Sequence, residues 1–247
     1  MLMQKFKNKI RQFWTYWYRR RYSFLFYSLS LTLIAFPILA TFKYDQTLLV
    51  WFVAINLMAA LGGLKSRYLS HLMLMISPII IGVRIIAGAI DFHAIVGLTT
   101  VVLIALGFFA CIDTVRVAMT SGKVSGELLY AALSVYMLIG ILFGIIHYAI
   151  GLEWRDAYIL PAGEVFSLRT SIYFSFVTQT TLGYGDVLPQ TELARGLTIV
   201  QAITGQLYLA VMVARLVGLY ASSAKRDELL GLDEALMESP KYPPPSA

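Results

Sequence analysis

The fold of this chain is decided by a short glycine-containing stretch, Thr180-Thr181-Leu182-Gly183-Tyr184-Gly185-Asp186. It follows an aromatic, helix-capable stretch that runs from Ser167 to Gln179. Glycine tolerates positive φ, so glycines at alternating positions allow the backbone to alternate between left- and right-handed conformations. This alternation can turn successive backbone carbonyls to the same side. A ring of such segments could replace the water shell of a cation with carbonyl oxygens.

The sequence around this stretch is strongly apolar. The chain has 247 residues, of which 58% are hydrophobic and 14% are charged, and its mean hydropathy is +0.71. A soluble domain carries about 25% charged residues, so this composition excludes an ordinary water-soluble enzyme. It also argues against a disordered chain, which would be polar and poor in aromatic residues. The sequence therefore predicts an all-α membrane protein.

Uncharged runs place six transmembrane helices along the chain. A helix rises about 1.5 Å per residue, so roughly 20 residues cross a hydrocarbon core of about 30 Å. The third run contains one internal charge, Arg84. The six predicted spans are Phe24–Phe42, Gln46–Leu64, Tyr68–Ile90, Phe92–Ile112, Leu128–Leu152 and Gly196–Ala214.

A seventh uncharged stretch, Thr170–Gly185, lies between the fifth and sixth predicted spans. It has 16 residues, which is short for a span, and it is rich in threonine with two glycines near its end. Polar, glycine-broken backbone cannot face lipid, because its N–H and C=O groups would stay unpaired. We therefore expect a re-entrant helix and loop that line a cavity or the protein interior.

The distribution of basic residues predicts the orientation. If the N-terminus is inside, 15 of the 20 lysines and arginines lie on the inner side and 4 on the outer side. This bias follows the positive-inside rule for six spans with both termini cytoplasmic. Orientation thus accounts for the net charge of +6, and no nucleic-acid partner is expected. Residues 1–23 read as an interfacial amphipathic helix whose basic cluster suits anionic lipids, either as a topology anchor or as a lipid sensor.

The motif Thr181-Leu182-Gly183-Tyr184-Gly185, followed by Asp186 and Pro189, resembles the selectivity filter of the tetrameric potassium channels. Leu182 stands where valine or isoleucine is commoner. The resemblance implies K+ sites formed by the backbone oxygens of Thr181 through Tyr184 and the Thr181 hydroxyl, with Asp186 at the outer mouth. One motif per chain implies a homotetramer. It also implies a passive channel rather than an enzyme, with K+ as the permeant ion and no organic cofactor.

The resemblance extends to residues around the motif. Tyr173 and Phe174 occupy positions where the family often has tryptophans, and Tyr173 could donate a hydrogen bond to Asp186 and brace the filter. Simple packing of the pore helix is the alternative for Tyr173. Gly205 lies within the last span, where a glycine is either a gating hinge or a site of close helix packing. His147, near the outer end of the fifth span, is expected to be a packed histidine rather than a proton sensor.

Six spans with a pore between the fifth and sixth resemble the architecture of voltage-gated cation channels. In that family the fourth span carries arginines at every third position, whereas Phe92–Ile112 contains none. Only Arg84 and Arg116 remain as possible gating charges, and Arg84 could instead pair with Asp113 or Asp91. Steep sensors move three or four charges per subunit, each contributing about 2.3 kcal/mol per 100 mV. We therefore expect weak or no intrinsic voltage dependence.

The predicted organisation has five parts: an interfacial helix (1–23), a four-helix peripheral domain (24–112), a cytoplasmic linker (113–127), the pore domain (128–216) and a short cytoplasmic tail (217–247). Compact loops and a short tail favour a prokaryotic inner membrane. A non-selective cation channel and a non-conducting scaffold or modulatory subunit are the alternatives. A transporter-type potassium uptake protein would need four pore segments in one chain, and this chain has one.

Overall fold

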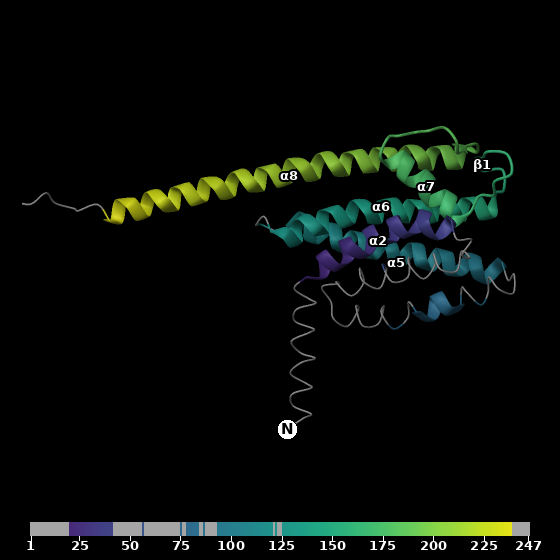
Figure 1. The fold of residues 1–247 in the computed structure, drawn as a ribbon, viewed down its shortest axis with the longest axis horizontal. Helices are drawn as coiled ribbons and strands as arrows, with labels where there is room; N and C mark the ends of the chain where they lie inside the picture. Colours follow the sequence, from purple (N-terminus) through teal and green to yellow (C-terminus); the bar gives the residue numbers. More distant parts are fainter. Residues whose placement is uncertain are drawn as a thin grey trace, which may run out of the picture.

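The computed structural model describes residues 20–41, 93–120 and 125–238, together with residues 56, 75, 78–83, 86 and 122. These residues are mostly helical, in agreement with the predicted class. The elements are α2 (Arg21–Thr41), α5 (His93–Thr120), α6 (Gly126–Glu153), β1 (Tyr158–Ile159), α7 (Leu168–Gln179), β2 (Leu188–Pro189) and α8 (Glu192–Glu238). Figure 1 shows them as a bundle from which the far end of α8 projects.

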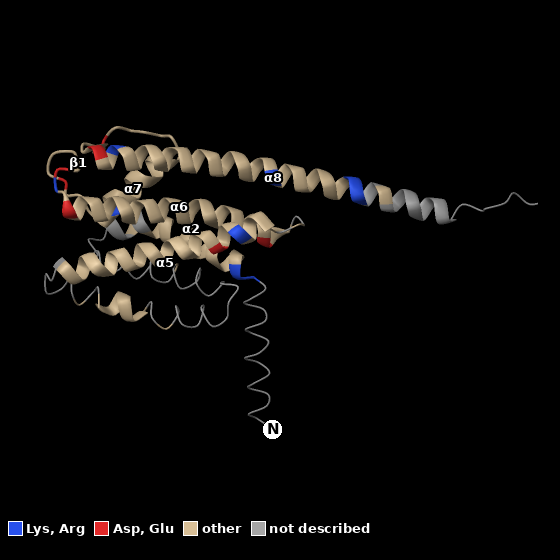
Figure 2. Cartoon of the chain, turned by 180° about the vertical axis from the view of Figure 1, so that it is seen from behind, with Lys and Arg blue, Asp and Glu red and all other residues tan. Residues whose placement is uncertain are grey.

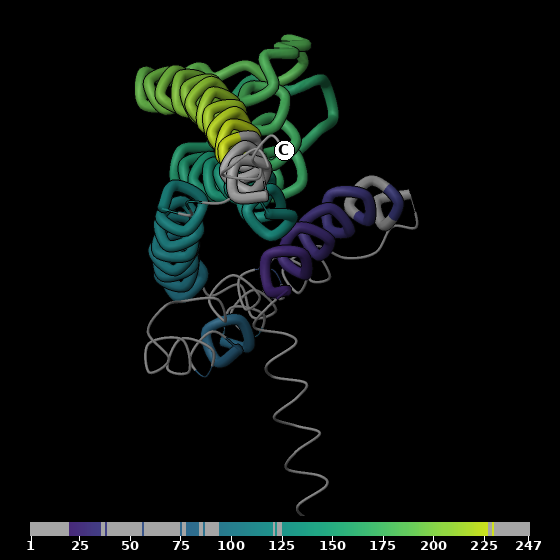
Figure 3. The backbone as a smooth tube through the Cα atoms, turned by 90° about the vertical axis from the view of Figure 1, so that its left-hand side faces the viewer, coloured from purple at the N-terminus to yellow at the C-terminus, as the bar shows by residue number. Residues whose placement is uncertain are grey.

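Helix α6 is the centre of the described fold. It packs against α2, α5, α7 and α8, and its residues from Leu128 to Ile150 supply much of the core. Seen along the helices, α8 lies at one edge, with α2 and α5 on the far side of α6 (Figure 3). Charged residues gather near the ends of α6 and near the start of α8 (Figure 2). Between these ends the described helices carry few charged side chains, which are costly in a membrane interior.

Among the described residues, three helices are long and apolar enough to cross a membrane: Ala94–Thr120, Gly126–Glu153 and Glu192–Arg226. They coincide with the predicted fourth, fifth and sixth spans, and α2 coincides with the first. Of the second span only Asn56 is described, and of the third only residues 75, 78–83 and 86, all of them helical. Arg84 and the interfacial helix as far as residue 19 lie outside the described residues.

Two helix ends differ from the predicted spans. Helix α5 continues past Ile112 to Thr120, so part of the segment expected to be a linker is helical. Helix α8 runs from Glu192 to Glu238, through and far beyond the predicted sixth span. The physical reason is that a charge ends an uncharged run but does not end a helix, since lysine, arginine and glutamate are good helix formers. A boundary placed at the first charged residue therefore marks the end of an apolar run and not the end of the helix.

Helix α7 is held against α6 by close glycine contacts. A Cβ on Gly140 would lie 2.6 Å from the Phe176 ring, and one on Gly144 would lie 2.9 Å from the Cα of Ile172. The missing side chains let α7 approach the α6 backbone closely. The loops that flank α7 are joined by the antiparallel pairing of β1 and β2, which places Tyr158 opposite Pro189 and Ile159 opposite Leu188. This small sheet was not predicted, because two residues per strand give no period to recognise.

Candidate functional site

The re-entrant helix predicted from Ser167 to Gln179 is α7, which covers Leu168–Gln179. Ser167 caps it, since its side-chain oxygen accepts the backbone N–H of Thr170 at 3.2 Å. Such a cap satisfies one of the free N–H groups at a helix start. The helix stops at Thr180, whose N–H still reaches the carbonyl of Phe176 at 2.9 Å. A capped helix of twelve residues therefore delivers the chain to the glycine-containing stretch.

The backbone of that stretch alternates in handedness. Thr181, Gly183 and Gly185 have φ of 61°, 55° and 77°. The glycine spacing predicts this conformation for Gly183 and Gly185. Thr181 was not expected to share it, because a left-handed residue with a side chain costs roughly 1–2 kcal/mol. It is the one non-glycine residue with positive φ in the described part of the chain.

The start of the stretch is anchored to the last turn of α7. The N–H groups of Leu182 and Gly183 both donate to the carbonyl of Val177, at 3.0 and 3.4 Å, and the N–H of Thr181 donates to Thr178. Residues 180–186 are nevertheless exposed on the single chain, with Leu182 57% and Tyr184 66% accessible. The backbone is thus held at one end and open towards its surroundings.

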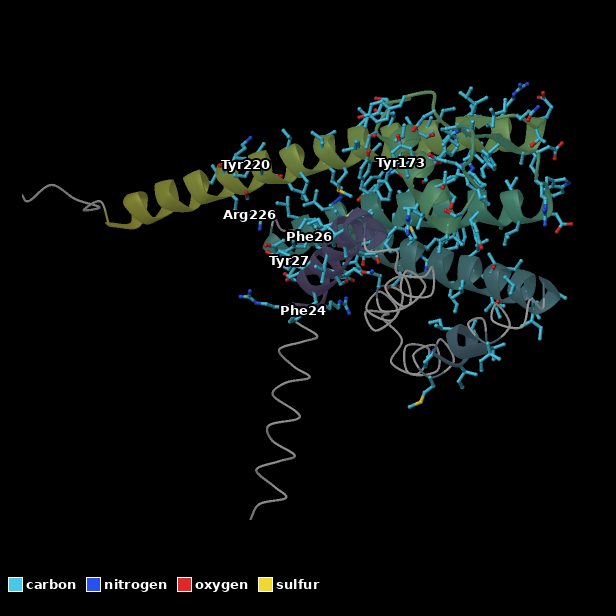
Figure 4. The ribbon with its side chains drawn as sticks, turned by 45° about the vertical axis from the view of Figure 1, so that its right-hand side comes forward. Phe24, Phe26, Tyr27, Tyr173, Tyr220 and Arg226 are labelled. Atoms are coloured by element: carbon cyan, nitrogen blue, oxygen red, sulfur yellow. The ribbon has the colours of Figure 1, made fainter. Side chains whose placement is uncertain are left out.

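Tyr173 and Asp186 meet beside the stretch, as predicted. The Tyr173 hydroxyl donates to Asp186 Oδ2 at 2.6 Å, and Asp186 Oδ1 accepts the N–H of Val187 at 3.1 Å. Tyr173 projects from the pore-helix region in Figure 4. The predicted hydrogen bond is confirmed, and it joins α7 to the far end of the glycine-containing stretch. Its effect on ion conduction stays a prediction.

Gly205 is buried where α8 crosses the end of α7. A Cβ there would lie 2.7 Å from Gln179 Cγ and 3.4 Å from the Gln179 carbonyl oxygen. That same carbonyl accepts hydrogen bonds from Gln206 Nε2 at 3.1 Å and from the Tyr136 hydroxyl at 3.3 Å. Close packing, one of the two predicted roles, therefore has a direct structural basis, while the hinge role stays a prediction.

The two candidate gating charges are placed differently. Arg116 lies on α5, exposed, within the helix rather than in a linker. Arg84 lies outside the described residues. A third arginine, which the sequence analysis did not single out, joins two helices: Arg215 Nη1 on α8 donates to the carbonyl of Ala118 near the end of α5, at 2.8 Å.

Comparison with known proteins agrees with this geometry. Residues 135–221 match a family model described as "Ion channel". This segment of the chain is similar to ion channels. The chain is 34% identical over 83 residues to "Two-pore potassium channel 4" of Arabidopsis thaliana, covering 34% of this chain and 28% of that protein. It is also 39% identical over 64 residues to "Probable potassium channel protein 2" of Methanocaldococcus jannaschii, covering 25% and 19%.

The chain thus spans less than a third of the length of these two relatives. No solved structure matches it. The matched segment contains most of α6, all of α7, the glycine-containing stretch and the first part of α8. These likenesses relate this segment to ion channels, and the apolar helices of the described residues are long enough to cross a membrane.

The prediction that His147 is a packed histidine agrees with its full burial, but sequence reasoning missed its polar partners behind α7. Ser175 and Gln201 are also fully buried. Gln201 contacts both Ser175 and His147, and His147 contacts Tyr158. Burial raises the pKa of Tyr158, which lies in β1 between α6 and α7, so its phenol stays protonated and can donate a hydrogen bond. The signal that could have found this cluster is polarity within apolar spans, since such residues usually face the protein interior and find partners there.

Proposed function

We propose that this protein is a homotetrameric, potassium-selective channel that passes K+ passively down its electrochemical gradient. One observation carries the proposal: the positive φ of Thr181, Gly183 and Gly185, directly after a capped half-helix. Such backbone alternation lets consecutive carbonyls face one axis. In this proposal the backbone oxygens of Thr181 through Tyr184, with the Thr181 hydroxyl, bind the permeant ions. Asp186 lies at the outer mouth, and no organic cofactor takes part.

Assembly into a tetramer is supported by what one chain leaves uncovered. In its most apolar stretch 17% of the residues of α8 are buried within the chain, against 61% for α6. Large apolar side chains that α8 leaves exposed include Ile199, Ile203 and Leu207. In a tetramer, neighbouring subunits and lipid would cover this face, and four exposed Thr181–Gly185 segments would close one ring.

Weak voltage dependence belongs to the same proposal. The α5 residues from His93 to Ile112 include no lysine or arginine, so the counterpart of a sensor helix carries only Arg116 near one end. We place the protein in the inner membrane of a prokaryotic cell with both termini cytoplasmic and the N-terminal basic helix on anionic lipid. The five-part organisation predicted from the sequence, with the pore domain at 128–216, completes the proposal.

The test is ion flux into liposomes that contain the purified full-length protein. We expect K+ uptake that barium blocks, with much slower Na+ uptake, and a shallow conductance–voltage curve in planar bilayers. Equal K+ and Na+ uptake would instead favour a non-selective cation channel. Protein that inserts and passes neither ion would favour the scaffold or modulatory role, and a steep conductance–voltage curve would contradict the proposed voltage dependence.

A further inference from the structure

Behind the pore helix, four buried side chains from four elements form one continuous chain of hydrogen bonds. Tyr158 of β1 contacts His147 Nδ1 of α6 at 2.6 Å, and His147 Nε2 contacts Gln201 Oε1 of α8 at 2.9 Å. Gln201 Nε2 then reaches the carbonyl oxygen and the hydroxyl of Ser175 on α7, at 2.8 and 2.6 Å. The Ser175 hydroxyl ends the chain at the carbonyl of Gly140, 2.6 Å away on α6.

The direction of every bond in this chain follows from one atom. The Ser175 carbonyl can only accept, so the amide nitrogen of Gln201 must face it and the amide oxygen must face His147. His147 Nε2 therefore carries a proton and donates. In a neutral imidazole the other nitrogen then accepts, so Tyr158 donates to Nδ1. Each of the four side chains is satisfied within this single arrangement.

Aromatic rings shield this chain of hydrogen bonds from water. His147 meets Phe174 edge-on, with ring centroids 5.0 Å apart, and Tyr158 stacks on Phe166 at 4.2 Å. Within the described structure His147, Ser175 and Gln201 have no exposed surface. Since a buried polar group that loses its partner gains no bond to water in exchange, these hydrogen bonds are costly to break.

This chain of hydrogen bonds ends close to the proposed filter. Ser175 lies on α7 two residues before Val177, and the Val177 carbonyl accepts the N–H groups of Leu182 and Gly183. Gln201 lies one helical turn before Gly205 on α8. A shift of α8 by one residue's rise, about 1.5 Å, would lengthen and bend the bonds from Gln201 to Ser175 and His147. The position of α8 and the position of the filter anchor are therefore linked through Gln201.

We propose that Gln201 and His147 are positioning residues that set the register of α8 against α7 and so hold the filter in its conducting geometry. The inference rests on the proposed channel function. It predicts that loss of the Gln201 bonds destabilises conduction at the filter without preventing assembly. The effect should pass through Ser175, because that is the residue on α7 that Gln201 contacts.

The experiment records single channels from full-length wild type, Gln201→Leu, Ser175→Ala and the double variant in planar bilayers. The control is Thr198→Val on the same helix, where the hydroxyl donates only within α8, to Ala194 at 2.7 Å. We expect the mean open time of Gln201→Leu to fall about tenfold or more, with tetramers intact by size exclusion. The loss in the double variant should be smaller than the sum of the two single losses, since both substitutions remove the bond from Gln201 Nε2 to the Ser175 hydroxyl.

The outcomes separate the two claims. A wild type that conducts, with Gln201→Leu open times equal to those of Thr198→Val, would overturn the positioning role and leave the channel function standing. Additive effects in the double variant would also overturn it. If Gln201→Leu fails to assemble, Ser175→Ala, which deletes one hydroxyl, decides alone by the same comparison. A wild type that passes no K+ would overturn both claims.

Discussion

The glycine-containing stretch and the buried face of α7 are neighbours in sequence but are built in opposite ways. Residues 180–186 are exposed, and three of residues 181–185 have positive φ. The buried face of α7 is regular helix, and Ser175 on it is fully satisfied by α6 and α8 of the same chain. Strained, exposed backbone persists only where its surroundings determine it. One chain therefore supplies the support, and the proposed ring needs further copies.

The largest expected effect comes from adding a side chain in the exposed glycine-containing stretch. We expect Gly183→Ala to reduce K+ flux in liposomes to background, because a methyl group at φ +55° strains the backbone by roughly 1–2 kcal/mol and crowds the proposed ring. Gly163→Ala is the matched control. Gly163 has φ +87° with open space around it, but it lies in the outer loop. Equal losses in both variants would mean that backbone strain alone, rather than the proposed filter, is responsible.

A second substitution disturbs the packing of α7 against α6, which supports the glycine-containing stretch. A Cβ on Gly144 would lie 2.8 Å from Ile172 Cγ1 and 2.9 Å from its Cα, so Gly144→Ala must push α7 away from α6. Overpacking of this kind costs about 1–3 kcal/mol, and we expect a lower thermal unfolding temperature of the detergent-solubilised protein together with reduced flux. Gly126→Ala in the same helix is the control, since the nearest atom to its Cβ would be Tyr130 Cε2, 4.0 Å away. An unchanged unfolding temperature for Gly144→Ala would contradict the close packing of α6 and α7.

A third experiment separates the two roles of Gly205. We expect Gly205→Ala to lower open probability several-fold, because its methyl group would meet Gln179 Cγ at 2.7 Å. If packing is the reason, shortening the partner with Gln179→Ala should restore part of the open probability in the double variant. A hinge would not be rescued in this way. Gly218→Ala, further along α8 with nothing within 4 Å, should behave as wild type.

The sequence predicted the parts of the site that are encoded locally. The short helix, the positive φ at Gly183 and Gly185 and the Tyr173–Asp186 bond all involve residues within twenty positions of one another. The chain through His147, Ser175 and Gln201 could not be predicted, because it joins residues on three helices that only the tertiary fold brings together. The positive φ of Thr181 was not predicted for another reason: threonine, unlike glycine, does not indicate a left-handed backbone.

The smallest expected effect lies at the junction of the two regions. Tyr173→Phe removes one hydrogen bond to Asp186 and little else, since the ring is already 40% exposed. Such a bond contributes about 1 kcal/mol, so we expect a change of about fivefold or less in the rate at which currents decline during sustained recording. Tyr27→Phe is the control, because the hydroxyl of Tyr27 (labelled in Figure 4) also makes a 3.0 Å bond, to Tyr130, but between α2 and α6. Identical decline in wild type and Tyr173→Phe would show that Val177 and the buried face of α7 hold the stretch without help from its outer end.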